Sequence, residues 1–241
     1  MEWSRNGNGP SAEQVHRRAL ALAYLACRAM VDADPRAEEM ACTVQNFVRE
    51  VGLEDAFEPA ELRMLQAPFG SFSDFELVET RWLVEGISVL AWALGKVDLP
   101  PFSTKCSAAP ASIALGMFRL GTKERLGEAS LRKVCEIESL ALTYLALHWR
   151  IGWQIDSPGK MDFAAQLKAP DHPHLLVDGL ELHDGDLTID GKELGQVAPE
   201  RFGEVFAIVR QRFNAFKWLQ GRAARYGADT TLQENMLDLL Y

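Results

Sequence analysis

The stretch Arg81–Gly95, RWLVEGISVLAWALG, decides the fold of this chain. Between its first and last residues it carries a single charged side chain, Glu85. On a helical wheel, apolar residues occupy both sides: Leu83, Val84, Ile87, Leu90 and Leu94 on one, and Trp82, Val89, Trp92 and Ala93 on the other. Because a helix that is apolar all round is buried all round, this stretch predicts a helix at the centre of a helical domain.

The signals around this stretch set the limits of the central helix and predict its neighbours. Ser73 and Glu76 form a capping box that begins the helix at about residue 74, and Gly95 supplies the stop. A second long helix is expected over residues 130–155, because its middle, Ser139–Trp149, carries no formal charge. We therefore predict two buried central helices, with a third long helix over residues 199–226, beginning at Pro199, packed beside them.

Apart from the central helix, the N-terminal half of the chain predicts a tail followed by shorter helices. Residues 1–10 are polar and glycine-rich, which predicts a flexible tail. The Ser11–Gln14 capping box begins a helix whose expected core face is Val15, Ala19, Leu22, Ala23, Ala26 and Met30. Further helices are expected from Asp34-Pro35 to Val51, over residues 59–65 and over residues 111–118.

Residues 156–198 differ in composition from the rest and are rich in proline and glycine. Within them, LELHDGDLTIDGKEL alternates polar and apolar residues, and Asp190-Gly191 is a type I′ turn signal. We predict a small β-hairpin at about residues 180–193. The fold class is thus mainly α: one multi-helix domain over residues 11–241, with a β-hairpin insertion.

Composition and charge exclude several classes of function. The 241-residue chain has a net charge of -9, which argues against a nucleic-acid surface or an anionic-membrane surface, since both need clustered Lys and Arg. The opening MEWSRNGNGPS lacks the apolar core of a secretory signal, and no apolar run is long enough to span a bilayer. The cysteines are far apart, without a CxxC pair, which predicts reduced thiols in a cytoplasmic protein: Cys27, Cys42, Cys106 and Cys135.

Three titratable side chains stand where apolar residues are expected: Glu85, His148 and Arg212. A buried lone charge is costly or shifts its pKa, so each needs a partner. One interpretation is a polar pocket with an acid, a base and an anion clamp. The other, which we favour, is a buried Glu85–Arg212 salt bridge between the central and last helices, with His148 bonded to a backbone carbonyl.

Aromatic residues and one acid complete the candidate pocket or buried polar cluster: Trp82, Trp149, Trp218 and Asp229. Trp218 points away from the phenylalanine face of its helix, which comprises Phe202, Val205, Phe206, Val209, Phe213 and Phe216. Trp218 therefore either packs against a second layer, the interpretation we favour, or lines a groove.

Metal-ligand patterns are weak in this sequence. His172 and His174, with Asp171, are candidate ligands, and His183 is the further imidazole, but no helix sets their spacing. The acids Asp184, Asp186 and Asp190 fail the calcium-loop pattern, because Thr188 stands at the fifth position and no Glu closes the loop. We expect no metal and no cofactor.

Several apolar motifs, in their order along the chain, resemble the bacterial domain of unknown function family 4272. They are Arg81-Trp82 with Glu85, VLAWALG at Val89–Gly95, EIESLALTYLALHW at Glu136–Trp149, RFNAFKWL at Arg212–Leu219, Asp229-Thr230, and DLTIDGKEL in the hairpin. The resemblance runs from about Pro59 onward, although Phe213 stands where members often carry His. It implies a mainly helical cytoplasmic domain and brings no activity, ligand or catalytic residue.

The sequence favours a non-catalytic interaction or binding protein, because no nucleophile–base signature, P-loop or G-x-S-x-G motif is present. The alternative is a hydrolase-type enzyme that uses Glu85, His148 and Arg212. We expect a protein or small-molecule partner of unknown identity, with no nucleic acid and no membrane.

Overall fold

A computed structural model describes residues 9–32, 34, 37–167, 179–223 and 225–226. The described chain is mainly α-helical with a small antiparallel sheet, which confirms the predicted fold class. The helices are α1 (Ala12–Asp32), α2 (Glu38–Val51), α3 (Pro59–Gln66), α4 (Asp74–Ala93), α5 (Ala108–Leu115), α6 (Thr122–Leu126), α7 (Val134–Asp156), α8 (Phe163–Leu167) and α9 (Pro199–Leu219). The strands are β1 (Leu182–His183), β2 (Asp186–Ile189) and β3 (Lys192–Glu193).

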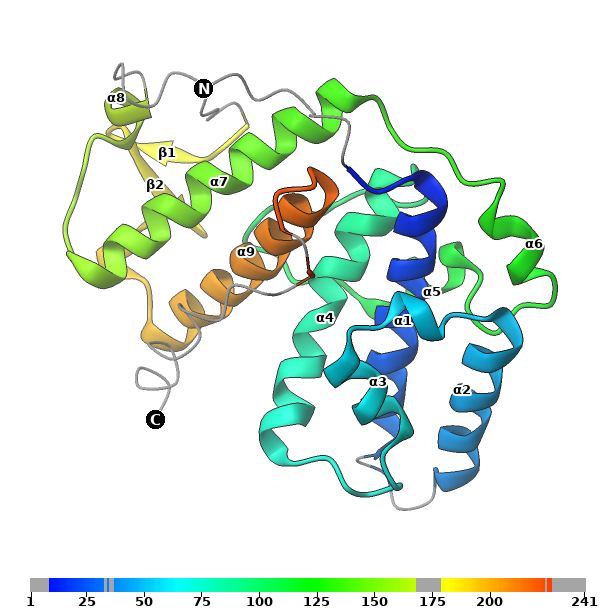
Figure 1. Cartoon of the computed structure of the whole chain (residues 1–241). Helices are drawn as coiled ribbons and strands as arrows, with labels where there is room; N and C mark the ends of the chain where they lie inside the picture. The colour runs from blue at the N-terminus through cyan, green and yellow to red at the C-terminus, as the bar shows by residue number, and fades with distance from the viewer. Residues whose placement is uncertain (1–8, 33, 35–36, 168–178, 224, 227–241) are drawn as a thin grey trace.

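Helix α4 lies at the centre of the molecule, as its sequence predicts. It packs against α1 and α5 and, through another face, against α9 (Figure 1). Every residue from Val84 to Ala91 is buried, so this part of the helix contacts protein all round. Gly86, Ser88 and Ala91 in this run have small side chains, which allow neighbouring helices to approach closely.

Helix α1 is more deeply buried than its predicted amphipathic pattern allows. All residues from Arg18 to Leu25 are buried, whereas Met30, which we expected on the core face, is 66% exposed. The overlooked signal is the charge-free run Ala19–Cys27. Because α1 packs along α4, these two helices form the centre of the N-terminal part of the core.

Helix α9 lies between α4 and α7, with extensive packing on both (Figure 1). Helix α7 is buried along one face, which carries Ile137, Ala141, Tyr144 and Leu147, whereas Trp153 on another face is 45% exposed. The prediction that this helix is buried on all sides is therefore wrong: α7 forms an outer layer on α9.

The predicted hairpin is present and extends to a third strand. The strands follow one another in the order β1-β2-β3, with antiparallel pairing throughout. Asp190 and Gly191 both have positive φ, as the predicted type I′ turn requires. Asp184 and Gly185 have the same conformation and form the turn between β1 and β2.

The predicted helix limits are correct where a cap is strong. The Ser11–Gln14 and Ser73–Glu76 capping boxes both form. Other predicted limits are wrong: α2 begins at Glu38 instead of near Asp34, α5 spans 108–115 instead of 111–118, α7 begins at Val134 instead of about 130, and α9 ends at Leu219 rather than 226. Gly221 follows the end of α9 with positive φ, so the stop lies at an earlier glycine than Gly227.

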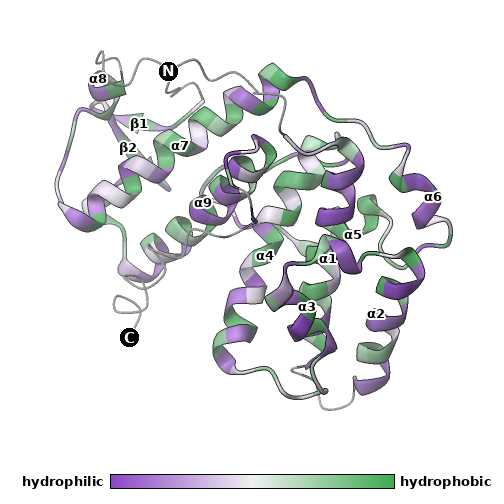
Figure 2. Ribbon diagram, viewed as in Figure 1, coloured by the Kyte–Doolittle hydropathy of each residue, from purple (hydrophilic) through white to green (hydrophobic). Residues whose placement is uncertain are grey.

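Hydropathy differs between two short helices that follow one another in the chain. Hydrophobic residues predominate in α5, whereas α6 is mostly hydrophilic (Figure 2). Within the described residues, none of the helices has the length and apolar character that crossing a membrane requires.

Candidate functional site

The predicted Glu85–Arg212 salt bridge forms inside the core. Nε of Arg212 on α9 donates to Oε2 of Glu85 on α4 at 2.8 Å, and both side chains are completely buried. The other carboxylate oxygen, Oε1, accepts from the backbone amide of Cys106 at 2.8 Å. Both oxygens of this buried carboxylate are therefore bonded.

Arg212 uses its remaining donors on the loop that joins α4 to α5, residues 96–107, and on α7. Nη1 and Nη2 donate to the carbonyl oxygens of Pro100 (3.0 Å), Pro101 (3.2 Å) and Thr104 (2.7 Å), to the Tyr144 hydroxyl (2.7 Å) and to Sγ of Cys106 (3.2 Å). One guanidinium thus holds an irregular loop and three helices together. This arrangement is a structural brace.

The ionisable neighbours of this brace are held in their neutral forms. Burial raises the pKa of the Cys106 thiol, although the Arg212 charge beside it acts in the opposite direction. Burial likewise raises the pKa of the Tyr144 phenol. A thiol of raised pKa beside a sealed ion pair is a poor nucleophile.

His148 does not join the pair in the described structure. Its ring stacks on Phe213, with centroids 4.8 Å apart, and on Phe206 at 6.0 Å. Burial, together with the positive charges of Lys217 and Arg210, lowers the pKa of His148 to about 4. It is therefore neutral at pH 7 and lies in an aromatic stack rather than beside Glu85.

The candidate tryptophans are dispersed over the molecule. Trp82 packs under the Lys105 ammonium, 4.4 Å from the ring centroid, and Trp149 stacks on Phe163. Trp218 meets Tyr226 edge to face and also lines a groove of about 470 Å³, so it both packs and lines a groove. Asp229 lies outside the described residues. The structure therefore does not gather these side chains into one pocket.

A cleft of about 610 Å³ opens where loop 96–107, α7 and the sheet region meet. Its lining joins aromatic and apolar side chains to carboxylates: Trp92, Leu99, Phe102, Leu140, Tyr144 and Leu147, with Asp98, Glu181 and Asp190. Tyr144 and the backbone of Pro100-Pro101 belong both to this lining and to the contacts of Arg212. The buried brace therefore shapes one wall of the cleft.

Arg201 on α9 fixes the position of the sheet relative to loop 96–107. Its Nε and Nη2 donate to the Asp190 carboxylate at 2.8 and 3.1 Å, and Nη2 also donates to the Ser103 carbonyl at 2.8 Å. No lysine or arginine belongs to the described lining itself. The lining residues are therefore acidic as well as apolar, with Arg201 paired to Asp190 and Arg132 placed 3.6 Å from Asp98 at the edge of the cleft.

Sequence reasoning missed a second buried pair, which attaches the sheet to α7. Nε and Nη2 of Arg150 donate to the two oxygens of Asp186 at 2.6 and 2.7 Å, and Arg150 is completely buried. The sequence could have indicated this pair, because Arg150 is a charged residue on the helix face that also carries the buried Leu147 and Ile151. Asp186 was considered only as a calcium ligand.

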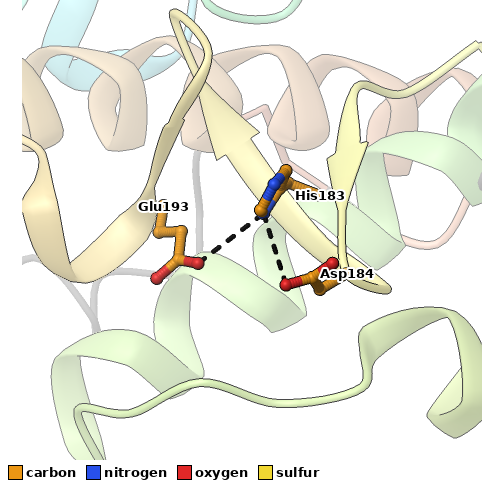
Figure 3. A group of neighbouring side chains, drawn as sticks. All are labelled: His183, Asp184 and Glu193. Atoms are coloured by element: carbon orange, nitrogen blue, oxygen red, sulfur yellow. Dashed lines mark ion pairs between the residues drawn. The ribbon is translucent and has the colours of Figure 1, made fainter.

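The acids considered as a calcium loop are already paired: Asp186 with Arg150, and Asp190 with Arg201. Asp184 instead lies beside His183 and Glu193 (Figure 3). Nζ of Lys160 bonds to both of these carboxylates, at 3.1 and 3.0 Å. The other candidate ligands, Asp171, His172 and His174, lie outside the described residues.

Comparison with known proteins identifies a family but no function. A family model described as a domain of unknown function (DUF4272) matches residues 3–154. The match begins earlier than the expected Pro59 and ends within α7, so it includes Glu85 and Tyr144 but not Arg212 or the sheet. No curated protein and no solved structure matches the chain.

Proposed function

We propose that this chain, which belongs to the DUF4272 family, is a binding protein whose site is the cleft between loop 96–107, α7 and the sheet. One observation carries the proposal: aromatic side chains and exposed carboxylates line the same concave surface. Small-molecule sites are concave, mostly apolar and roughly 300–1,000 Å³ in volume, with a few polar groups that orient the ligand. The cleft, at about 610 Å³, lies within that range.

The lining favours a ligand with an aromatic or apolar body and a positive charge. Trp92 and Phe102 are partly exposed rings in this lining, and the Arg132 guanidinium already lies 5.1 Å from the Trp92 ring centroid, as expected because aromatic faces attract cations as well as apolar groups. Glu181 and Asp98 are exposed carboxylates at the same cleft. An anionic ligand would meet like charges there. We therefore infer a small cationic partner.

The hydrolase alternative takes second place because its three residues do not form one accessible site. Glu85 and Arg212 have no exposed surface, and His148 stacks between phenylalanines. General acid–base catalysis needs these groups within hydrogen-bond reach of a substrate. We further propose a cytoplasmic location, consistent with four free thiols, and a partner other than nucleic acid or membrane, consistent with the net charge of -9.

The experiment blocks the cleft with a bulky side chain introduced on α7. Thr143 lines the cleft, and Thr143→Trp should place an indole in the space that a ligand would occupy. The probe is tyramine, which carries an aromatic ring and an ammonium group, with 4-hydroxyphenylacetate as the anionic counterpart. By NMR titration, tyramine should shift amide peaks of residues 98–103, 140–147 and 179–190, and Thr143→Trp should weaken binding at least about tenfold.

Thr43→Trp on α2 is the matched control. Thr43 and Thr143 are both half-buried helical threonines whose hydroxyls donate to the carbonyl four residues earlier, at 2.9 and 3.2 Å. The control should leave tyramine binding unchanged. Equal effects of the two substitutions, tighter binding of the anion, or shifts that avoid the cleft would contradict the proposal.

A further inference from the structure

Three metal-ligating side chains converge on the sheet, and none of them belongs to the lining of the proposed binding cleft. Nδ1 of His183 lies 3.7 Å from Oδ2 of Asp184 and 3.6 Å from Oε1 of Glu193 (Figure 3). All three ligand atoms lie within 4.8 Å of one another. One imidazole with two carboxylates is a donor set that suits zinc.

The spacing of these atoms is close to that of ligands on a zinc ion. With zinc–nitrogen and zinc–oxygen distances of about 2.0–2.1 Å, neighbouring ligands of a tetrahedral ion are about 3.3–3.4 Å apart. The His183–Glu193 and His183–Asp184 distances, 3.6 and 3.7 Å, exceed this spacing by a few tenths of an ångström, and the two carboxylate oxygens lie within 4.8 Å of each other. Small side-chain rotations would therefore close the site around an ion.

The backbone holds the three residues in place without an ion. His183 pairs with Asp186 across the β1–β2 ladder, and Glu193 pairs with Thr188 across the β2–β3 ladder. Asp184 is the first residue of the tight turn between β1 and β2. The ligands thus come from the two outer strands of one meander and from the turn after the first strand, so all three are positioned by the same short backbone unit.

A cation already lies between the two carboxylates. Nζ of Lys160 bonds to Oδ2 of Asp184 and to Oε1 of Glu193, the same oxygens that face the imidazole. The Lys160 side chain is 48% exposed and lies between α7 and α8. Its long side chain can therefore leave for solvent when another cation arrives.

We propose that His183, Asp184 and Glu193 form a zinc-binding site in which the metal ion displaces the Lys160 ammonium. The proposal does not depend on the function proposed for the cleft. Three protein ligands leave the remaining coordination position of a tetrahedral ion to water. Because every ligand is solvent-accessible, we expect reversible binding.

The experiment is a titration with zinc chloride alone, followed by NMR, in a Cys42→Ser, Cys135→Ser background. Both cysteines are exposed thiols that would otherwise bind zinc. Zinc should shift the amide peaks of residues 182–193, and His183→Ala should weaken binding at least about tenfold through loss of the nitrogen ligand. Since His183 is exposed, peaks outside this region should show that the variant remains folded.

Two lysine variants separate displacement of Lys160 from a general effect of charge. Lys160→Met should tighten zinc binding about tenfold, because a competing positive charge leaves the site. Lys192→Met removes an equal charge from the same sheet but leaves the bonds of Lys160 intact, so its effect should be much smaller. Unchanged affinity in His183→Ala, equal effects of the two lysine variants, or zinc shifts confined to other segments would overturn the proposal.

Discussion

Buried arginines are the residues on which this core depends. Arg28, Arg150 and Arg212 are among its largest fully buried side chains, and each bonds to a carboxylate and to loop carbonyls. Arg28, for example, pairs with Asp32 and donates to the carbonyl oxygens of Ala67 and Pro68. A guanidinium has five donors, so one side chain can satisfy several backbone oxygens that a buried loop would otherwise leave unpaired.

Removal of Glu85 should therefore destabilise the whole fold. In Glu85→Ala, Arg212 keeps its neutral acceptors but loses its only described carboxylate, which leaves a buried charge uncompensated. We expect a loss of about 3–5 kcal/mol in the free energy of unfolding, measured by urea denaturation.

Tyr144→Phe provides the comparison for Glu85→Ala. It removes one hydrogen bond between the Arg212 guanidinium and a neutral hydroxyl and keeps the ion pair, so it should cost about 2 kcal/mol. If both substitutions lowered the free energy of unfolding by a similar small amount, the ion pair would not be the main stabilising interaction of Arg212.

Among the elements, the sheet depends on α7 for its attachment. Arg150 reaches from the helix to Asp186 on β2, and the same carboxylate accepts from the amides of Met161 and Leu187. Burial alone would raise the pKa of Asp186, but the hydrogen bonds from Arg150 and the two amides hold it below its ordinary value. The carboxylate is therefore bound more strongly in its ionised form.

This lowered pKa gives the sheet region a defined response to acid. An aspartate whose folded pKa is depressed stabilises the fold above its unfolded pKa of about 3.9, and this contribution is lost as pH falls through the folded pKa. Asp186→Asn should reduce the free energy of unfolding at pH 7 and flatten its fall below about pH 4. Urea midpoints at several pH values would measure both effects; an unchanged acid slope would show that Asp186 is not linked to folding.

The helices themselves are largely predictable from local signals. The apolar stretch around Val84–Ala91 and the capping boxes at Ser11 and Ser73 act over a few residues, and the structure confirms each. Limits without such signals, at the start of α2 and the end of α9, were misplaced. Whether a charge-free helix becomes a centre, like α1, or an outer layer, like α7, depends on neighbours that local sequence does not specify.

In the molecule as a whole, features built from segments that are distant in the sequence differ in how far the sequence predicts them. The Glu85–Arg212 pair was predictable although 127 positions separate its residues, because two lone opposite charges on apolar faces limit the choice of partner. The cleft was not predictable, because its lining combines loop 96–107, α7 and the sheet region, none of which carries a recognisable ligand-binding motif. The grouping of His183 with Glu193 likewise depends on the register of a short meander.

Glu85 and Arg212 form a sealed brace rather than an open reactive pocket, and hydrogen exchange at the Arg212 Nε–H distinguishes these two arrangements. Arg201 is the internal reference: its Nε also donates to a carboxylate at 2.8 Å, but its side chain is 31% exposed, whereas that of Arg212 is fully buried. NMR should show exchange at Arg212 at least about a hundredfold slower than at Arg201, because solvent reaches it only when the core opens. Equal exchange rates at the two arginines would contradict a sealed core and return Glu85 and Arg212 to the open pocket of the hydrolase alternative.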